Sequence, residues 1–201
     1  GKDLVGSLRA VLAALERAPA RMRLPDDRTP EPGDSLEFVL GREEAAVVFA
    51  ALLGSAEAQP YFAAFVGAAS GGDFSLLGRL ALARLRPRRP PAAMSFAMDC
   101  ASGGSEARRR RIGRESARTT LGDATNNWEF ALCDVWNVPD LGESFRAPVR
   151  SDLPVLFISG TLDLNTPPSN AEEVRAGFPR GAHLVIEGVA HSDPLFLSSP
   201  R

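Results

Sequence analysis

The sequence predicts an α/β fold, and the evidence for it lies near the C-terminal end. Two short apolar runs, at residues 154–159 and 182–187, are each followed at once by a glycine, as buried parallel strands often are. Between them, from about Ser169 to Gly177, the pattern is that of a helix. The order strand, helix, strand is typical of an α/β domain. Upstream of Pro87 the pattern is mainly helical, so we expect a mostly helical part followed by the last parallel strands and helices of such a domain.

The N-terminal part is predicted to combine helices with a small hairpin. Apolar residues recur at helical spacing over residues 3–17, which predicts an amphipathic helix. Arg21 to Leu24 and Ser35 to Leu40 alternate in polarity around a loop rich in Pro, Asp and Gly, which predicts a hairpin. Three further helices are expected at residues 45–53, 61–69 and 74–85. Their apolar residues are interpreted as helix-packing core rather than as a lipid or ligand groove.

The centre of the chain has weaker patterns. Met94 to Cys100 is predicted to be extended, Ser105 to Thr119 to be an arginine-rich helix, and Asn126 to Trp136 to be helical. Ser169 to Glu172 fits a capping box, which favours a helix start there.

Composition bounds the class of protein and its partners. With 201 residues and 44% hydrophobic content, the chain can bury a sizeable core. Its formal charge of -2 argues against nucleic acid or an anionic membrane as the main partner. No apolar stretch approaches the ~20 residues of a membrane helix, and the first residues do not resemble a signal peptide. The arginine run 108–111 could bind a polyanion, but Glu106 and Glu115 are spaced to pair with it, so a solvated helix face is favoured.

The two cysteines, Cys100 and Cys133, leave the redox compartment open. They are either two buried thiols or one disulfide of an exported protein. Their spacing matches no metal site, and we predict neither a metal nor another cofactor.

Asp163 and His191 are the candidate catalytic residues. Each follows one of the two predicted strands, with a helix between them, so both should lie at the carboxyl edge of the sheet, within hydrogen-bonding reach. A carboxylate that accepts a bond from one imidazole nitrogen fixes the tautomer, and the other nitrogen can then deprotonate a nucleophile. A turn-capping role for Asp163 is the alternative. His183, inside its strand, has no comparable partner and is assigned no role.

The motif expected to carry the nucleophile of such a pair is missing. No Gly-x-Ser-x-Gly occurs in the chain, so the serine lies outside it or in a variant motif. Gly103 to Ala107 is a near match centred on Ser105, with the right order relative to Asp163 and His191. The residues before it are mainly helical in pattern, which favours Ser105 as a helix cap instead.

Residues 152–168 and 188–192 resemble the C-terminal, TAP-like region of α/β-hydrolase peptidases of the tripeptidyl aminopeptidase and proline iminopeptidase group. Cys100, Cys133 and Trp136 resemble a Cys…Cys-x-x-Trp pattern of the same group, which implies that the two cysteines lie close enough to bridge. By this resemblance Asp163 is the triad acid, His191 is the triad base, and a helical lid shapes a pocket for the free amino end of a peptide substrate.

The resemblance also implies a division of the chain. Residues 1–91 would be a helical lid with a small hairpin, 92–149 a connecting region, and 150–201 the C-terminal part of the catalytic domain. The first strands, the oxyanion loop and the serine motif of the family are not found here, and its Cys-x-Asp is replaced by Cys100-Ala101-Ser102.

The expected partner is therefore a peptide substrate, together with the remaining N-terminal hydrolase segment or a second copy of the chain. Two alternatives are a non-catalytic binding or self-associating module and a compact hydrolase that uses Ser105. By itself the chain is expected to be inactive.

Overall fold

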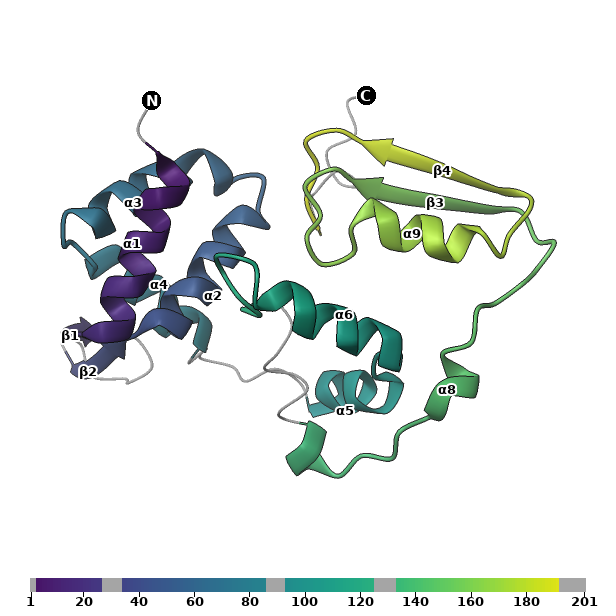
Figure 1. The fold of residues 1–201 in the computed structure, drawn as a ribbon, viewed down its shortest axis with the longest axis horizontal. Helices are drawn as coiled ribbons and strands as arrows, with labels where there is room; N and C mark the ends of the chain where they lie inside the picture. The colour runs from purple at the N-terminus through teal and green to yellow at the C-terminus, as the bar shows by residue number, and fades with distance from the viewer. Residues whose placement is uncertain (1–2, 27–33, 86–92, 125–132, 192–201) are drawn as a thin grey trace. The chain divides into compact units, whose positions relative to one another are not determined.

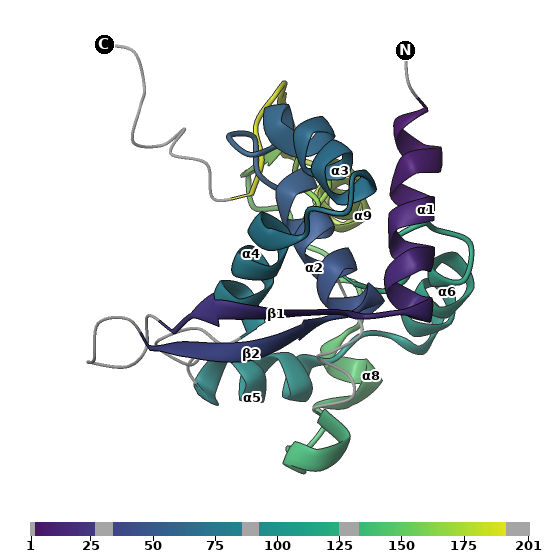
Figure 2. The ribbon, with the colours of Figure 1, turned by 90° about the vertical axis from the view of Figure 1, so that its left-hand side faces the viewer.

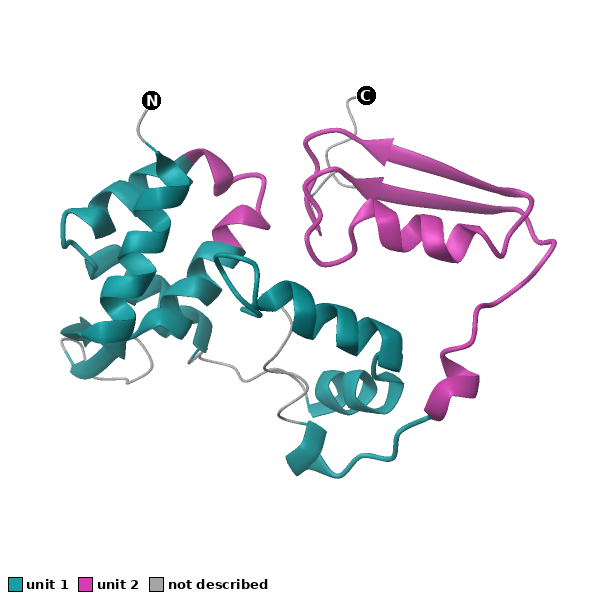
Figure 3. Ribbon diagram, in the orientation of Figure 1, with its two compact units in different colours: residues 1–50, 61–141 teal, residues 51–60, 142–201 magenta. Residues whose placement is uncertain are grey.

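The structure, a computed structural model, describes residues 3–26, 34–85, 93–124 and 133–191. It contains helices and both antiparallel and parallel strands (Figure 1), in agreement with the predicted α/β class. The first of two compact units comprises residues 1–50 and 61–141, and the second comprises residues 51–60 and 142–201 (Figure 3). No helix within the described ranges is both long and apolar enough to cross a bilayer.

The first unit begins with the helix predicted at the N-terminus. Helix α1 (Leu4–Arg17) starts after Asp3, whose carboxylate accepts the N–H of Gly6 at 2.9 Å and so caps the helix. Its apolar face is buried and α1 packs against α3 (Phe62–Ser70). The buried side chains of this face are Leu8, Val11, Leu12 and Leu15.

The predicted hairpin is present in the same unit (Figure 2). Strands β1 (Ala20–Pro25) and β2 (Ser35–Leu40) pair antiparallel, with Ala20 opposite Leu40. The loop 27–33 lies outside the described residues. Helix α4 (Ser75–Leu85) packs on this hairpin.

The remaining helices of the predicted helical block are also confirmed. Helix α2 (Arg42–Leu53) buries Phe49 completely, and the ring of Phe49 meets Phe62 edge to face at 5.6 Å. A short 3-10 helix, η1 (Gln59–Tyr61), precedes α3.

The expectation of an extended segment at Met94 to Cys100 is wrong. These residues belong to helix α5 (Ala93–Ser102). The 10 residues of α5 include three alanines and two methionines, which are strong helix formers, so intrinsic propensity favours the helix. The arginine-rich helix is confirmed as α6 (Glu106–Ser116), with ion pairs from Glu106 and Glu115 to its arginines. Of the helix expected at 126–136, residues 126–132 lie outside the described ranges and 133–136 are helical.

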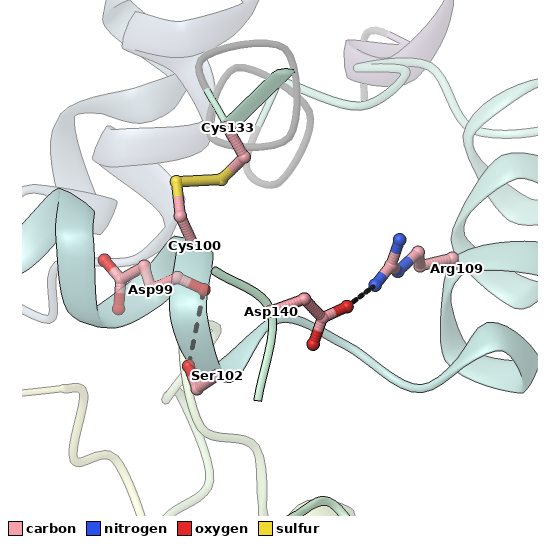
Figure 4. The surroundings of a disulfide bond; sticks show 6 residues. All are labelled: Asp99, Cys100, Ser102, Arg109, Cys133 and Asp140. Atoms are coloured by element: carbon pink, nitrogen blue, oxygen red, sulfur yellow. Dashed lines mark hydrogen bonds and ion pairs between the residues drawn. A yellow bond between two sulfur atoms is a disulfide. The ribbon is translucent and has the colours of Figure 1, made fainter. Parts of the chain in front are cut away.

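Cys100 and Cys133 form a disulfide, as the resemblance implied (Figure 4). Their Cα atoms are 5.2 Å apart, and the bridge ties α5 to the helical residues 133–136. The ring of Trp136 lies beside that of Phe96 in α5, with centroids 5.8 Å apart. Arg109 of α6 and Asp140 form an ion pair at 3.7 Å near the same bridge.

The second unit contains the predicted strand, helix and strand. After a short helix, α8 (Gly142–Phe145), come β3 (Val155–Gly160), α9 (Pro168–Arg175) and β4 (Gly181–Ile186). The two strands are parallel, with Val155 opposite Gly181, and α9 packs against both of them.

The predicted capping box of α9 is wrong. The N-cap is Pro167, which makes no side-chain capping bond, and Pro168 occupies the first turn, where its missing N–H costs nothing. Glu172 instead bonds to His183 and Arg175.

We expect the disulfide to stabilise the first unit. The chain-entropy model gives about 3–4 kcal/mol for the loop that it closes, whose ends are 33 residues apart. The double variant Cys100→Ser/Cys133→Ser should therefore unfold at lower denaturant concentration, as measured by circular dichroism. Reductant should destabilise the parent but leave the double variant unchanged, and a parent indifferent to reductant would contradict this expectation.

Candidate active site

Asp163 lies in the turn between β3 and α9. Its Oδ1 accepts the backbone N–H groups of Asn165 at 2.9 Å and Thr166 at 2.8 Å. Its Oδ2 accepts the hydroxyl of Thr166 at 2.7 Å. An aspartate that bonds to backbone two and three residues ahead defines a tight turn. The turn therefore fixes the orientation of the carboxylate.

His191 ends the loop that follows β4, and this loop is bonded to the Asp163 turn. Gly188 has φ of 76°, a left-handed conformation that favours glycine. Its N–H donates to the hydroxyl of Thr161 at 2.9 Å, and the N–H of Leu162 donates to the carbonyl of Val189 at 2.9 Å. These bonds hold the two loops together independently of the contact between Asp163 and His191.

The structure brings Asp163 and His191 together as predicted. His191 Nδ1 lies 3.0 Å from Asp163 Oδ2 and 3.2 Å from the hydroxyl oxygen of Thr166. Asp163 is 8% exposed, whereas the His191 side chain is 42% exposed. The carboxylate is therefore shielded, and the imidazole remains open to solvent.

This arrangement sets the tautomer of the imidazole. A carboxylate can only accept, so Nδ1 of His191 carries the proton and donates it to Asp163. In the neutral ring Nε2 is then an acceptor. Among the described residues none is hydrogen-bonded to Nε2, so this nitrogen is available for a proton from a nucleophile.

The environment of Asp163 changes its pKa. Burial alone would raise the pKa, but the bonds from the Thr166 N–H and hydroxyl and from His191 outweigh it and hold the pKa of Asp163 below its ordinary value. The carboxylate is therefore ionised at neutral pH and can support an imidazolium.

Sequence reasoning missed two features of this unit. Thr166 was not singled out from the sequence, although a threonine three residues after an aspartate has a spacing that allows a side-chain bond. His183 was expected to have no comparable partner, and that expectation is wrong. Its buried ring bonds to Glu172 and Ser159. The sequence did contain a signal for the contact between His183 and Ser159, because the two residues lie in strands that were predicted to be neighbours.

Ser105 is not set on a nucleophile elbow. Its hydroxyl accepts the N–H of Arg108 at 3.3 Å and caps α6, and the segment before it is the helix α5. An elbow requires a strand before the serine and a helix after it, so the cap interpretation is confirmed. Within the described residues no group of three or more His, Cys, Asp or Glu side chains could hold a metal ion.

Comparison with known proteins agrees with the resemblance stated above. The family model described as TAP-like protein, an α/β-hydrolase family, matches residues 119–195, a range that contains both Asp163 and His191. The predicted similarity of the C-terminal part to this family is thereby confirmed, and it indicates a hydrolase. Searches of curated proteins and of solved structures gave no match.

Gly160 permits the close approach of the two loops. A Cβ at this position would collide with the backbone carbonyl of Val189. We expect Gly160→Ala to destabilise the protein by about 1–3 kcal/mol, as overpacking does, and to separate Asp163 from His191. The matched control is Gly113→Ala, on an exposed helix with no atom near its Cβ position, which should be neutral or stabilising. Equal unfolding midpoints for the two variants would show that the approach of the loops is not restrictive.

The pKa of Asp163 gives a second expectation. The pKa of Asp163 is lower in the folded protein than in the unfolded chain, where it is about 3.9. The ionised carboxylate therefore stabilises the fold at any pH above the unfolded pKa. The contribution is lost as pH falls through the folded pKa. Thr166→Val should raise the pKa of Asp163 in a carbon-13 carboxyl titration, since it removes the hydroxyl bond. Asp163→Asn identifies the resonance, and an unchanged pKa in Thr166→Val would contradict the assigned cause.

Proposed function

We propose that this chain supplies the acid and base of a serine hydrolase, with Asp163 as acid and His191 as base. The observation that carries the proposal is the bond of 3.0 Å between His191 Nδ1 and Asp163 Oδ2, within the range that matches the TAP-like family. The nucleophilic serine is proposed to lie outside this chain.

The proposed mechanism follows from the two nitrogens of His191. Nε2 takes the proton of the serine hydroxyl as the oxygen attacks the substrate carbonyl, and the imidazolium is stabilised by Asp163. His191 then gives this proton to the amine of the leaving group. The amine departs, and the substrate acyl group remains bonded to the serine as an acyl-enzyme. Water attacks the acyl-enzyme with His191 again as base, and the acid product and free serine result. Thr166 keeps the carboxylate aligned throughout by donating to Oδ2.

We propose an exopeptidase that acts on the free amino ends of short peptides, as the resemblance implies. In this proposal residues 1–91 form the lid, 92–149 connect it to the core, and 150–201 form the C-terminal part of the catalytic domain. An N-terminal hydrolase segment would supply the serine and the oxyanion donors, which in serine hydrolases account for much of the rate.

A second candidate function is self-association without catalysis. Leu156 and Ile158 alternate with Phe157 along β3 and lie on the sheet face opposite α9, where they are exposed together with Leu184 of β4. A two-stranded sheet with an apolar face and free edges invites pairing between chains. Concentration-dependent dimers in sedimentation, without any hydrolase activity in the longer reading frame, would favour this candidate.

The hydrolase proposal is tested with a fluorophosphonate probe. We expect no labelling and no peptide turnover by this chain alone, because the pair has no serine to activate. The polypeptide that includes the reading frame upstream of Gly1 should be labelled and should release residues from free amino ends. In it, Asp163→Asn should lower kcat by about 10⁴-fold, the effect of the wrong tautomer. Asp152→Asn, an exposed carboxylate before the start of β3, is the matched control and should leave kcat unchanged.

Two results would overturn the proposal. One is full activity of the longer protein after His191→Ala. The other is stoichiometric labelling of this chain at Ser105 that Ser105→Ala abolishes, which would establish the compact hydrolase instead.

A further inference from the structure

A second chain of polar side chains lies in the same unit and is not used by the proposed chemistry. The carboxylate of Glu172 is 2.6 Å from His183 Nδ1, and His183 Nε2 is 2.9 Å from the hydroxyl of Ser159. Glu172 also pairs with Arg175 at 2.8 Å. The order acid, histidine, serine matches that of a catalytic triad.

Burial excludes a catalytic use of this serine. The His183 side chain is 4% exposed and Ser159 is 8% exposed, so no peptide carbonyl can reach the hydroxyl. The ring of His183 lies in the layer between the sheet and α9, where it meets Phe157 edge to face. The chain of bonds therefore acts on the structure around it.

The bonds have a defined direction. The bonds from His183 and then from Arg175 lower the pKa of Glu172, so its carboxylate is ionised and can only accept. Nδ1 of His183 is therefore the donor to Glu172, and in the neutral ring Nε2 accepts the hydroxyl proton of Ser159. All three side chains are satisfied in one arrangement, which restricts the ring to one orientation.

The three elements joined in this way are those that carry the candidate site. Ser159 is in β3, just before the turn that holds Asp163, and Glu172 is in α9, just after that turn. His183 is in β4, which leads to His191. Apolar contacts between sheet and helix are non-directional, whereas hydrogen bonds weaken steeply when their geometry changes.

We propose that the Glu172–His183–Ser159 chain of hydrogen bonds positions the Asp163–His191 pair by fixing β3, α9 and β4 in register. His183 is thus a positioning residue, not a catalytic one. This inference rests on the proposed role of Asp163 and His191 as the acid and base pair.

The test uses nitrogen-15 NMR of the full chain, which contains only two histidines. At pH about 8.5, two units above the ordinary histidine pKa, the His191 Nδ1–H proton that is bonded to Asp163 should exchange slowly with water. Asp163→Asn gives the reference rate for a broken pair. We expect Glu172→Ala and Ser159→Ala to speed this exchange by roughly tenfold or more, the factor that corresponds to a lost buried hydrogen bond.

Two kinds of control separate positioning from general loosening. Glu172→Gln retains an acceptor for Nδ1–H, so the exchange rate should stay within about twofold of the parent, since the polar chain is preserved. Phe157→Leu weakens the contact between sheet and helix but keeps the polar chain, and it should lower the thermal midpoint without changing the exchange rate. Glu172 is half exposed, so Glu172→Ala opens no cavity in the core.

The outcomes are distinct. The proposal is overturned if Glu172→Ala and Ser159→Ala leave the exchange at the parent rate, or if Phe157→Leu speeds it as much as they do. If the parent already exchanges as fast as Asp163→Asn, the pair is not formed in solution. The proposed function then fails, and the positioning role fails with it.

Discussion

The candidate site depends on the hydrogen bonding of one buried carboxylate. Asp163 is almost completely removed from solvent, and an ionised carboxylate is stable there only if its oxygens are satisfied. The turn provides this through two backbone N–H groups and the Thr166 hydroxyl. None of these three bonds involves His191, so the turn itself orients the carboxylate, and the fold has only to bring the histidine to it.

Delivery of the histidine is a consequence of parallel strands. The carboxyl ends of β3 and β4 lie at one edge, so the residues that follow them meet there. Gly160 and Gly188 make the meeting possible by different means, the first through the space of a missing side chain and the second through its left-handed backbone. Asp163 and His191 are thus brought together by three features, each with a physical reason: the acidic turn, the parallel pairing of the strands and the two glycines.

Much of this could be predicted from the sequence because its signals are local. Apolar runs that end in glycine indicate the strands, and residues that follow them occupy a known edge, which was enough to pair Asp163 with His191. The two failures have different causes. At Met94 to Cys100 the helix propensity of alanine and methionine prevails over the extended structure that we expected. Ser169 to Glu172 reads like a capping box, but a tertiary partner takes the acid. Glu172 in particular bonds to His183, eleven residues away, instead of to its own helix end.

The contrast between the two histidines follows from their surroundings. Both use Nδ1 to donate to a carboxylate, so the local chemistry is alike. The second nitrogen of His183 bonds to Ser159 in the layer between sheet and helix. The ring of His191 is partly exposed, and no described residue bonds to its second nitrogen. A histidine with both nitrogens bonded and buried can hold structure but has no proton site left to offer. Exposure of the second nitrogen, more than the presence of an acid partner, is therefore what distinguishes a candidate base from a structural histidine in this fold.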